Sequence, residues 1–257
     1  MKIIGVITAR MGSSRFPGKP LYPILGIPMV EHVYKRAKMY NKWDHLVIST
    51  CDQEIVNFCN SKNFPVMKTS HLHKRALDRT AETATLIPEI KNDDVVLCVQ
   101  GDEPMMHPEM IDTTIQPIIS NHVDATVLGM EIIDENVWKN EDIVKIIHNE
   151  NYKVLYTSRS PIPNSFFKSN YNTKIRRIYG ILAFKYKALI EFVNFHETFL
   201  EQVESCDSNR ILDMSFDQYV APIKYFDSFS VDSPEDIIKV EEYLINDPIY
   251  FKYKNEK

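Results

Sequence analysis

Three cations and no acidic residue follow the first apolar segment of the chain. The stretch ARMGSSRFPGKP, residues 9–20, contains Arg10, Arg15 and Lys19 together with two glycines, two serines and two prolines. Glycine lets backbone N–H groups approach an anion, and arginine and lysine add charge-assisted hydrogen bonds. A solvated basic turn is the alternative interpretation. The preceding run KIIGVIT predicts a buried strand, and α/β sheets bind ligands at the carboxyl ends of their strands, so we favour a polyphosphate site.

This loop matches neither of the common phosphate-binding motifs. A Walker A loop has four residues between its glycines and a serine or threonine after its lysine. Here five residues separate Gly12 from Gly18, and Pro20 follows Lys19. A GxGxxG fingerprint is also missing, which argues against a dinucleotide site. Without a hydroxyl after the lysine, carboxylates elsewhere in the chain must hold any metal ion.

Two acidic segments could supply those carboxylates. VQGDEPM places Asp102 and Glu103 directly after a predicted buried strand, and SVDSPED places Asp232 after the last predicted strand. Two carboxylates beside a triphosphate are the expected ligands for a hard cation such as Mg²⁺. The alternative is that these acids only form turns or cap the helices that follow them. We expect Asp102 and Asp232 to bind Mg²⁺ together.

Strands alternate with helices in the first hundred residues. Short apolar runs predict strands at residues 2–8, 45–50, 64–69 and 94–100. Helical spacing of apolar residues predicts helices at residues 28–40, 52–62 and 78–90. This alternation is typical of an α/β fold, with a mostly parallel sheet, helices on both faces and right-handed crossovers.

The pattern loosens beyond residue 104. We expect strands at residues 124–132, 142–149, 153–158, 176–186 and 219–226, and helices at residues 187–195, 199–214 and 233–245. The end of the chain, FKYKNEK, is predicted to be a frayed polar tail. Since no change in composition marks a linker, we expect one domain over residues 1–257, with a small cap or dimerisation lobe within about 104–180.

The composition excludes several kinds of partner. A net charge of −5 and a pI of about 5.9 indicate no general surface for nucleic acid. No apolar run is long enough to span a bilayer, and the first one is too short for a signal peptide. The four cysteines form no CxxC pair and no zinc-binding spacing. We therefore expect a cytoplasmic protein with no membrane partner.

Four segments together resemble the CMP-sugar synthetases, and most of all the members that activate 3-deoxy-manno-octulosonate (Kdo). They are ARMGSSRFPGKPL, VQGDEPM, SRSPIP and SVDSPEDI, in the family's order and spacing from residue 1 to about 246. The resemblance implies a Rossmann-like nucleotidyltransferase fold, a homodimer, CTP and Mg²⁺. The implied reaction couples CMP to a 2-keto sugar acid with release of pyrophosphate, in the biosynthesis of surface polysaccharide, lipopolysaccharide or capsule.

The resemblance also implies roles for individual residues. Arg10, Ser13, Arg15 and Lys19 would grip the triphosphate, with Arg79 as a further nucleotide-binding residue. Lys19, Arg10 and Asp102 would act on the reacting phosphate. Gln100, Lys145 and Arg159 would face the acidic acceptor. Gly180 matches a glycine in one of the family's strands.

Three departures from the family pattern fall where the acceptor is expected. Arg75, Ala76 and Leu77 replace a Ser-Gly-Thr segment, Ile178 replaces a sugar-facing histidine, and Asp207 and Ser208 replace Glu and Gln. Arg75 and Ser208 are therefore included among the acceptor-binding candidates. Arg75 would favour an acceptor with extra negative charge, such as a phosphorylated or phosphonate compound. An amino-sugar acid and a non-catalytic nucleotide-binding relative remain as alternatives to an ulosonic acid.

Overall fold

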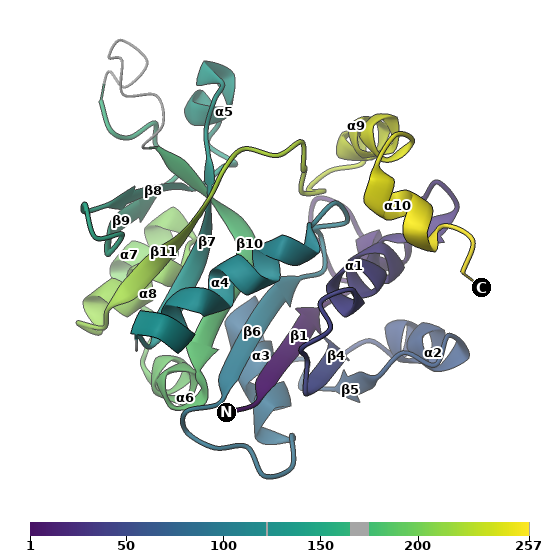
Figure 1. Ribbon diagram of the computed structural model, residues 1–257, viewed down its shortest axis with the longest axis horizontal. Helices are drawn as coiled ribbons and strands as arrows, with labels where there is room; N and C mark the ends of the chain where they lie inside the picture. Colours follow the sequence, from purple (N-terminus) through teal and green to yellow (C-terminus); the bar gives the residue numbers. More distant parts are fainter. Residues whose placement is uncertain (122, 165–174, 257) are drawn as a thin grey trace.

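The structure is a computed structural model that describes residues 1–121, 123–164 and 175–256. Within these residues nine strands form one sheet, with the central order β11-β7-β10-β6-β1-β4-β5 and with β8 and β9 extending it beside β10 (Figure 1). The strands are β1 (Ile3–Thr8), β4 (His45–Thr50), β5 (Val66–Lys68), β6 (Val95–Gln100), β7 (Ala125–Glu131), β8 (Lys145–His148), β9 (Val154–Ser158), β10 (Arg176–Lys185) and β11 (Gln218–Ile223). A short hairpin is formed by β2 (Pro23–Ile24) and β3 (Ile27–Pro28).

The sheet is mostly parallel, as the alternating pattern predicts. β1 pairs in parallel with β4 and β6, β4 with β5, and β11 with β7. β10 runs antiparallel to β6, β7 and β8, and β8 runs antiparallel to β9. The expected α/β class is therefore confirmed, with one antiparallel strand inserted into the middle of the sheet.

Helices cover both faces of the sheet. They are α1 (Met29–Lys38), α2 (Gln53–Ser61), α3 (Ala76–Thr85), α4 (Pro108–Asn121), α5 (Glu135–Lys139), α6 (Tyr186–Asn194), α7 (Phe199–Glu204), α8 (Asp207–Asp213), α9 (Glu235–Leu244) and α10 (Pro248–Tyr253). On one face α1, α2 and α4 enclose a core that includes Val95, Leu97 and Val99 of β6. On the other face α3, α6 and α8 pack over Val96 and Cys98. The alternation along β6 explains why a continuous apolar run marks a strand buried on both sides.

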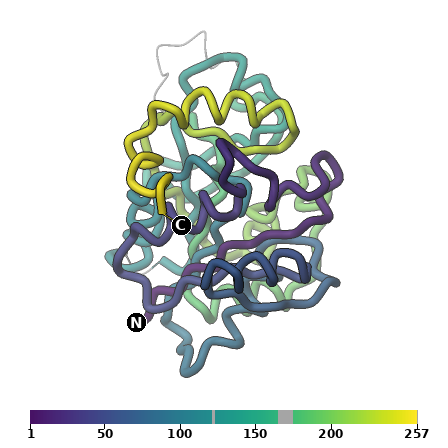
Figure 2. The backbone as a smooth tube through the Cα atoms, turned by 90° about the vertical axis from the view of Figure 1, so that its right-hand side faces the viewer, coloured from purple at the N-terminus to yellow at the C-terminus, as the bar shows by residue number. Residues whose placement is uncertain are grey.

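Two predicted elements differ in the structure. The helix predicted at residues 199–214 is two helices, because Ser205 adopts a left-handed conformation with φ of 50° and ends α7. The frayed tail is also wrong, since α10 covers its first three residues and buries Tyr253. The Tyr253 hydroxyl hydrogen-bonds with His32 Nδ1 at 2.7 Å and accepts from Arg36 Nε at 3.0 Å. Figure 2 shows this last segment returning beside the N-terminal part of the chain.

The region predicted as a lobe contains α4, β7, α5, β8, β9 and the start of β10. Its strands extend the sheet away from β1 and β4 (Figure 1). Residues 165–174 of that region lie outside the described part of the chain. None of the helices in the described residues combines the length and the apolar character that a bilayer span requires.

Candidate active site

The candidate site begins where β1 and β6 end side by side. Thr8, the last residue of β1, pairs with Gln100, the last residue of β6, so the loops that follow both strands leave the sheet together. The Gly101 N–H donates to the Thr8 carbonyl at 3.0 Å. A Cβ atom on Gly101 would lie 2.5 Å from that oxygen, so only glycine permits this approach. The geometry brings the cationic loop next to the acidic one.

The cationic loop is anchored at both ends. The Met11 N–H donates to Asp52 Oδ2 at 2.7 Å, and the Gly18 N–H donates to the Met11 carbonyl at 3.0 Å. Phe16 is buried in an apolar cluster with Met105 and residues of α9 and α10. The loop is therefore held as a rigid turn, and its polar side chains are left to face the cavity.

A cavity of about 290 Å³ lies at this edge of the sheet. It is lined by Thr8, Ala9, Arg10, Ser13, Ser14, Arg15, Lys19, Pro20, His73, Lys74, Arg75, Ala76, Arg79, Gln100, Gly101, Asp102 and Asp232. Nine of the predicted site residues are in this lining: Arg10, Ser13, Arg15, Lys19, Arg75, Arg79, Gln100, Asp102 and Asp232. Segments more than 200 residues apart in the sequence are thus brought to one cavity with a predominantly cationic wall.

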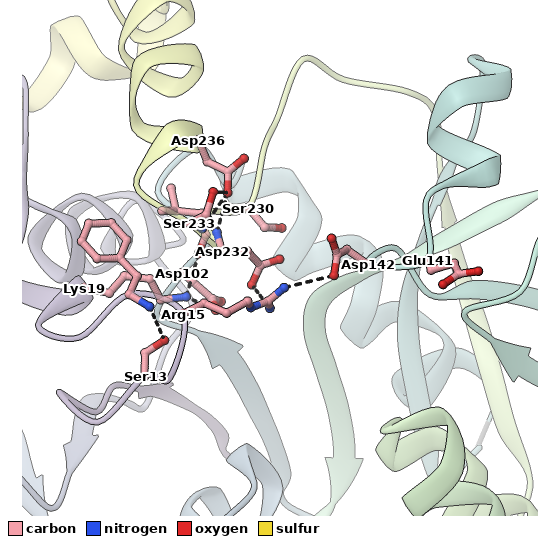
Figure 3. A network of polar contacts seen from close by, with 12 residues as sticks. Ser13, Arg15, Lys19, Asp102, Glu141, Asp142, Ser230, Asp232, Ser233 and Asp236 are labelled. Carbon is pink, nitrogen blue, oxygen red and sulfur yellow. Dashed lines mark hydrogen bonds and ion pairs between the residues drawn. The ribbon is translucent and has the colours of Figure 1, made fainter.

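Two of the cations are paired with the two candidate metal ligands (Figure 3). Lys19 Nζ lies 2.8 Å from Asp102 Oδ2 and donates to the Val231 carbonyl at 2.6 Å. Arg15 Nη2 lies 2.7 Å from Asp232 Oδ1. Arg10 makes no hydrogen bond or ion pair within the described part of the chain. If a triphosphate and a divalent cation entered together, the phosphates could replace the carboxylates as partners of Lys19 and Arg15. The cation could then replace Lys19 and Arg15 as the partner of the two carboxylates.

The two carboxylates fit a divalent metal ion. Asp102 Oδ1 is buried and has no hydrogen-bond partner within the described residues. Burial, followed by the negative charge of Asp102, raises the pKa of Asp232. No group of three His, Cys, Asp or Glu side chains suited to a metal occurs in the described residues. The pair of Asp102 and Asp232 suits Mg²⁺, because Mg²⁺ usually binds one or two carboxylates and completes its coordination shell with phosphate oxygens and water.

The α3 side of the cavity contributes Arg79 and His73. The Arg79 guanidinium is buried and donates to Thr69 Oγ1 and to Cys51 Sγ, which leaves it fixed at the cavity wall. His73 Nε2 forms a hydrogen bond with the Glu82 carboxylate. Ser14, His73 and Lys74 line the cavity but were not among the predicted site residues. Ser14 could have been found from its position inside the cationic loop.

Arg75 lines the cavity, but carboxylates already surround its guanidinium. It lies 3.0 Å from Glu201 and 3.0 Å from Asp207, and it also pairs with Glu197. These acids belong to α7, α8 and the segment before them, so Arg75 ties the start of α3 to that region. Burial is the main cause that raises the pKa of Asp207 to about 6. The positive charge of Arg75 is therefore neutralised within the protein.

Lys145 and Arg159 lie outside the cavity lining, in a neighbouring cluster. The Lys145 ammonium is fully buried and donates to the backbone carbonyls of Asn140, Ile143 and Arg159. Burial, and after it the charge of Arg159, lowers the pKa of Lys145 to about 8. Arg159 donates to the carbonyls of Glu204, Glu141 and Asp142. Both side chains hold the turn at residues 140–143, which presents Asp142 to Arg15 at 3.1 Å.

Two of the departures noted in the sequence also lie away from the cavity lining. Ser208 is buried in the first turn of α8, and its hydroxyl has no partner in the described residues. Ile178 packs against the apolar core between the sheet and α3 and α6. Glu103, which the sequence places beside Asp102 but to which no role was assigned, is buried.

Known proteins resemble this chain over nearly its whole length. The family profile described as Cytidylyltransferase matches residues 4–218. The 3-deoxy-manno-octulosonate cytidylyltransferase of Thermodesulfovibrio yellowstonii is 35% identical over 255 residues, which cover 95% of this chain and 98% of that protein. The 8-amino-3,8-dideoxy-manno-octulosonate cytidylyltransferase of Shewanella frigidimarina is 34% identical over 96% of this chain and 100% of its own length. A solved CMP:2-keto-3-deoxy-manno-octonic acid synthetase complexed with CTP has a TM-score of 0.86 and 27% identity, over 95% of this chain and 99% of that one.

Proposed function

Because this chain belongs to the cytidylyltransferase family, we propose that it transfers CMP from CTP to an ulosonic acid, either Kdo or a close relative, and releases pyrophosphate. The observation that carries the proposal is the cavity at the ends of β1 and β6. There Arg10, Arg15 and Lys19 face Asp102 and Asp232. This is the arrangement that a metal-bound triphosphate needs.

The cationic loop would hold the triphosphate and neutralise the charge that grows on the leaving pyrophosphate. The acceptor's anomeric hydroxyl oxygen attacks the α-phosphorus of CTP, the bond from that phosphorus to the pyrophosphate oxygen breaks, and the hydroxyl proton is released to water or to the leaving pyrophosphate. Catalysis by the protein is then mostly orientation and charge stabilisation. Lys19 and Arg15 would exchange their carboxylate partners for phosphate oxygens, while Arg10, which has no partner among the described residues, would have none to exchange.

Asp102 and Asp232 would hold Mg²⁺, which supplies electrostatic activation of the phosphate that is attacked. Asp102 Oδ1, which is buried without a hydrogen-bond partner among the described residues, supports this assignment. Burial and then the negative charge of Asp102 raise the pKa of Asp232, and a divalent cation beside the two carboxylates would offset that repulsion. Gln100 and Arg79 complete the wall of the cavity, and we retain them as acceptor-facing and nucleotide-binding residues respectively.

The pairing of Arg75 favours an ulosonic acid over an acceptor with extra negative charge. An additional phosphate or phosphonate would need a cation that is free to meet it, and Arg75 is bound to three acids. An amino-sugar acid remains the second candidate, because a relative equally similar to this chain is named for an 8-amino acceptor. A positive amine would be compatible with the acidic surroundings of Arg75.

A panel of acceptors tests this proposal. Pyrophosphate release is measured with CTP, Mg²⁺ and, in turn, Kdo, its 8-amino analogue and a phosphonate of similar size. We expect kcat/KM to be highest for one of the two ulosonic acids. A higher kcat/KM for the phosphonate would contradict the assignment of the acceptor class, and UTP in place of CTP tests the choice of nucleotide.

We further propose that the protein forms a homodimer through the lobe within residues 104–180, as the family resemblance implies. Light scattering on a size-exclusion column gives the mass directly, and a value near 30.0 kDa would mean a monomer and contradict the proposal. The cytoplasmic location and the role in surface polysaccharide synthesis expected from the sequence stay predictions.

A further inference from the structure

Glu103 is a buried carboxylate beside the candidate metal ligand Asp102. Its side chain is only 3% exposed. One oxygen, Oε1, accepts from the Gly180 N–H at 3.1 Å and from the Ser230 hydroxyl at 2.7 Å. The other oxygen, Oε2, is buried without a hydrogen-bond partner among the described residues, so the carboxylate depends on the two bonds to Oε1 for its place.

The structure makes room for this side chain in the middle of β10. A Cβ atom on Gly180 would lie 2.7 Å from Glu103 Oε1 and 3.0 Å from Gln100 Cβ. Any other residue at position 180 would push Glu103 out of its place. The glycine that matches the family's strand is therefore explained by the carboxylate that it accommodates.

Through Ser230, Glu103 reaches the segment that carries Asp232. This segment runs from the end of β11 at Ile223 to the start of α9 at Glu235 and has no helix or strand of its own. Next to Ser230, the Val231 N–H donates to the Asp102 carbonyl at 2.9 Å, and the Val231 carbonyl accepts from Lys19. Figure 3 shows Ser230, Asp232 and Asp102 close together at this junction. The loop after β6 thus holds the segment at Ser230 and at the Val231 N–H, and Lys19 holds it at the Val231 carbonyl.

On its other side the same segment is held by α9. Asp236 Oδ2 accepts from the backbone N–H groups of Asp232 and Ser233, at 2.9 Å and 2.8 Å. Asp232 therefore sits between one fixed point on α9 and one on the loop after β6. The second point links Asp232 to Asp102, and Lys19 adds to this link because it bonds both to Asp102 and to the Val231 carbonyl.

We propose that Glu103 is a positioning residue that sets the separation of Asp102 and Asp232 by holding Ser230 against the backbone of β10. The inference rests on the proposed function only in taking those two carboxylates as the Mg²⁺ ligands. Mg²⁺ demands a nearly regular octahedron at short distances, so a shift of one ligand weakens binding sharply. Residues that orient metal ligands typically change metal affinity by about 10–100-fold when they are replaced.

Three substitutions distinguish the positioning role of Glu103 from the effect of its negative charge. Glu103→Leu removes both hydrogen bonds, and Ser230→Ala removes only the bond to the segment that carries Asp232. Glu103→Gln keeps an oxygen that can accept from Gly180 and Ser230 but removes the charge. Ser233→Ala is the matched control, because Ser233 lies in the same segment and its hydroxyl bonds to acids of α9, with Asp236 at 3.2 Å, and not to the loop after β6 within the described residues.

The measurement is calorimetric titration of CTP into each variant at a series of Mg²⁺ concentrations, and again with EDTA. We expect Glu103→Leu and Ser230→Ala to raise the half-saturating Mg²⁺ concentration by about tenfold. Their CTP affinity in EDTA should stay within about twofold of the wild type. Glu103→Gln should restore most of the metal affinity, and Ser233→Ala should match the wild type.

Two results would overturn the inference. Metal affinity unchanged in Ser230→Ala would mean that Glu103 does not act through this segment, and this variant decides the question if Glu103→Leu fails to fold. Equal losses in Glu103→Gln and Glu103→Leu would mean that the charge matters, as for a direct metal ligand. This binding assay contains no acceptor, so it tests the inference separately from the proposed function. If no acid yields a CMP product but the shifts in metal affinity are observed, the proposed function is wrong and the inference stands. Absence of any CTP binding by the wild type would contradict both.

Discussion

Replacing Lys19 with methionine should weaken CTP binding more than replacing Arg15 with alanine. The Lys19 side chain is only 11% exposed, and its ammonium makes two short hydrogen bonds inside the cavity wall. Methionine retains most of the volume and removes the charge. A hydrogen bond to a charged group contributes about 1.5–3 kcal/mol, and a loss of about 2 kcal/mol reduces affinity by about 30-fold.

Arg15 should contribute less because water screens it. Its side chain is 53% exposed, and its partners Asp142 and Asp232 are 67% and 39% exposed. Exposed pairs contribute about 0.2–1 kcal/mol, so Arg15→Ala should reduce affinity by about fivefold at most. The order of the two losses therefore follows from burial and not from the charge of the residues.

Calorimetry with CTP in the presence of EDTA tests both values, since a change in metal affinity then has no influence. Lys139→Met is the control, because Lys139 is 60% exposed and pairs with Glu135 within α5. It should leave CTP affinity unchanged. Wild-type affinity in Lys19→Met, or a larger loss in Arg15→Ala than in Lys19→Met, would refute the reasoning.

Two further predictions concern stability. Tyr253→Phe removes the hydroxyl that bonds to His32 Nδ1 and to Arg36 Nε, which should cost about 1–3 kcal/mol and lower Tm by roughly 2–12 °C. Tyr243→Phe, at a residue 40% exposed, should change Tm little, and equal shifts in the two variants would contradict the role of α10. The raised pKa of Asp207, about 6, means that the folded protein keeps a proton that the unfolded chain releases near pH 4, so ionisation of this carboxyl costs stability at neutral pH. Denaturant unfolding should therefore show the stability of Asp207→Asn relative to the wild type increasing by about 1.3 kcal/mol between pH 5 and pH 7, and a difference independent of pH would contradict this.

The sheet and the cationic loop could be predicted from the sequence because local signals determine them. β1, β4 and β6 are apolar runs of a length typical of strands. The loop after β1 lies at the carboxyl edge of the sheet because β1 ends there. The nucleotidyltransferase fold implied by the family resemblance is confirmed by the similarity to the solved synthetase. The antiparallel placement of β10 between β6 and β7 depends on contacts far apart in the sequence, and no local pattern reveals it.

The direction in which a polar side chain points was the main thing that the sequence could not reveal. Lys145 reads as a cation available to an acidic acceptor, yet three backbone carbonyls enclose its ammonium. Arg75 lies at the cavity, as its position predicts, but its acidic partners come from α7 and α8, more than 100 residues later. The sequence of the C-terminal residues predicts a frayed polar tail because it does not show what Tyr253 contacts. The buried partners of Tyr253 are His32 and Arg36, which lie more than 200 residues earlier in the chain.

Pyrophosphate release by Asp102→Asn compared with the wild type tests the catalytic cavity most directly. Wild-type protein mixed with CTP, Mg²⁺ and Kdo, or its close ulosonic relatives, should release pyrophosphate in equal amount to the CMP-linked product. Asparagine keeps the shape of Asp102 but removes a carboxylate that would hold the metal, and the rate should fall by about a hundredfold or more while the fold is kept. Equal rates for Asp102→Asn and the wild type, or no release by the wild type with any ulosonic acid, would contradict a metal-dependent CMP transfer at this site.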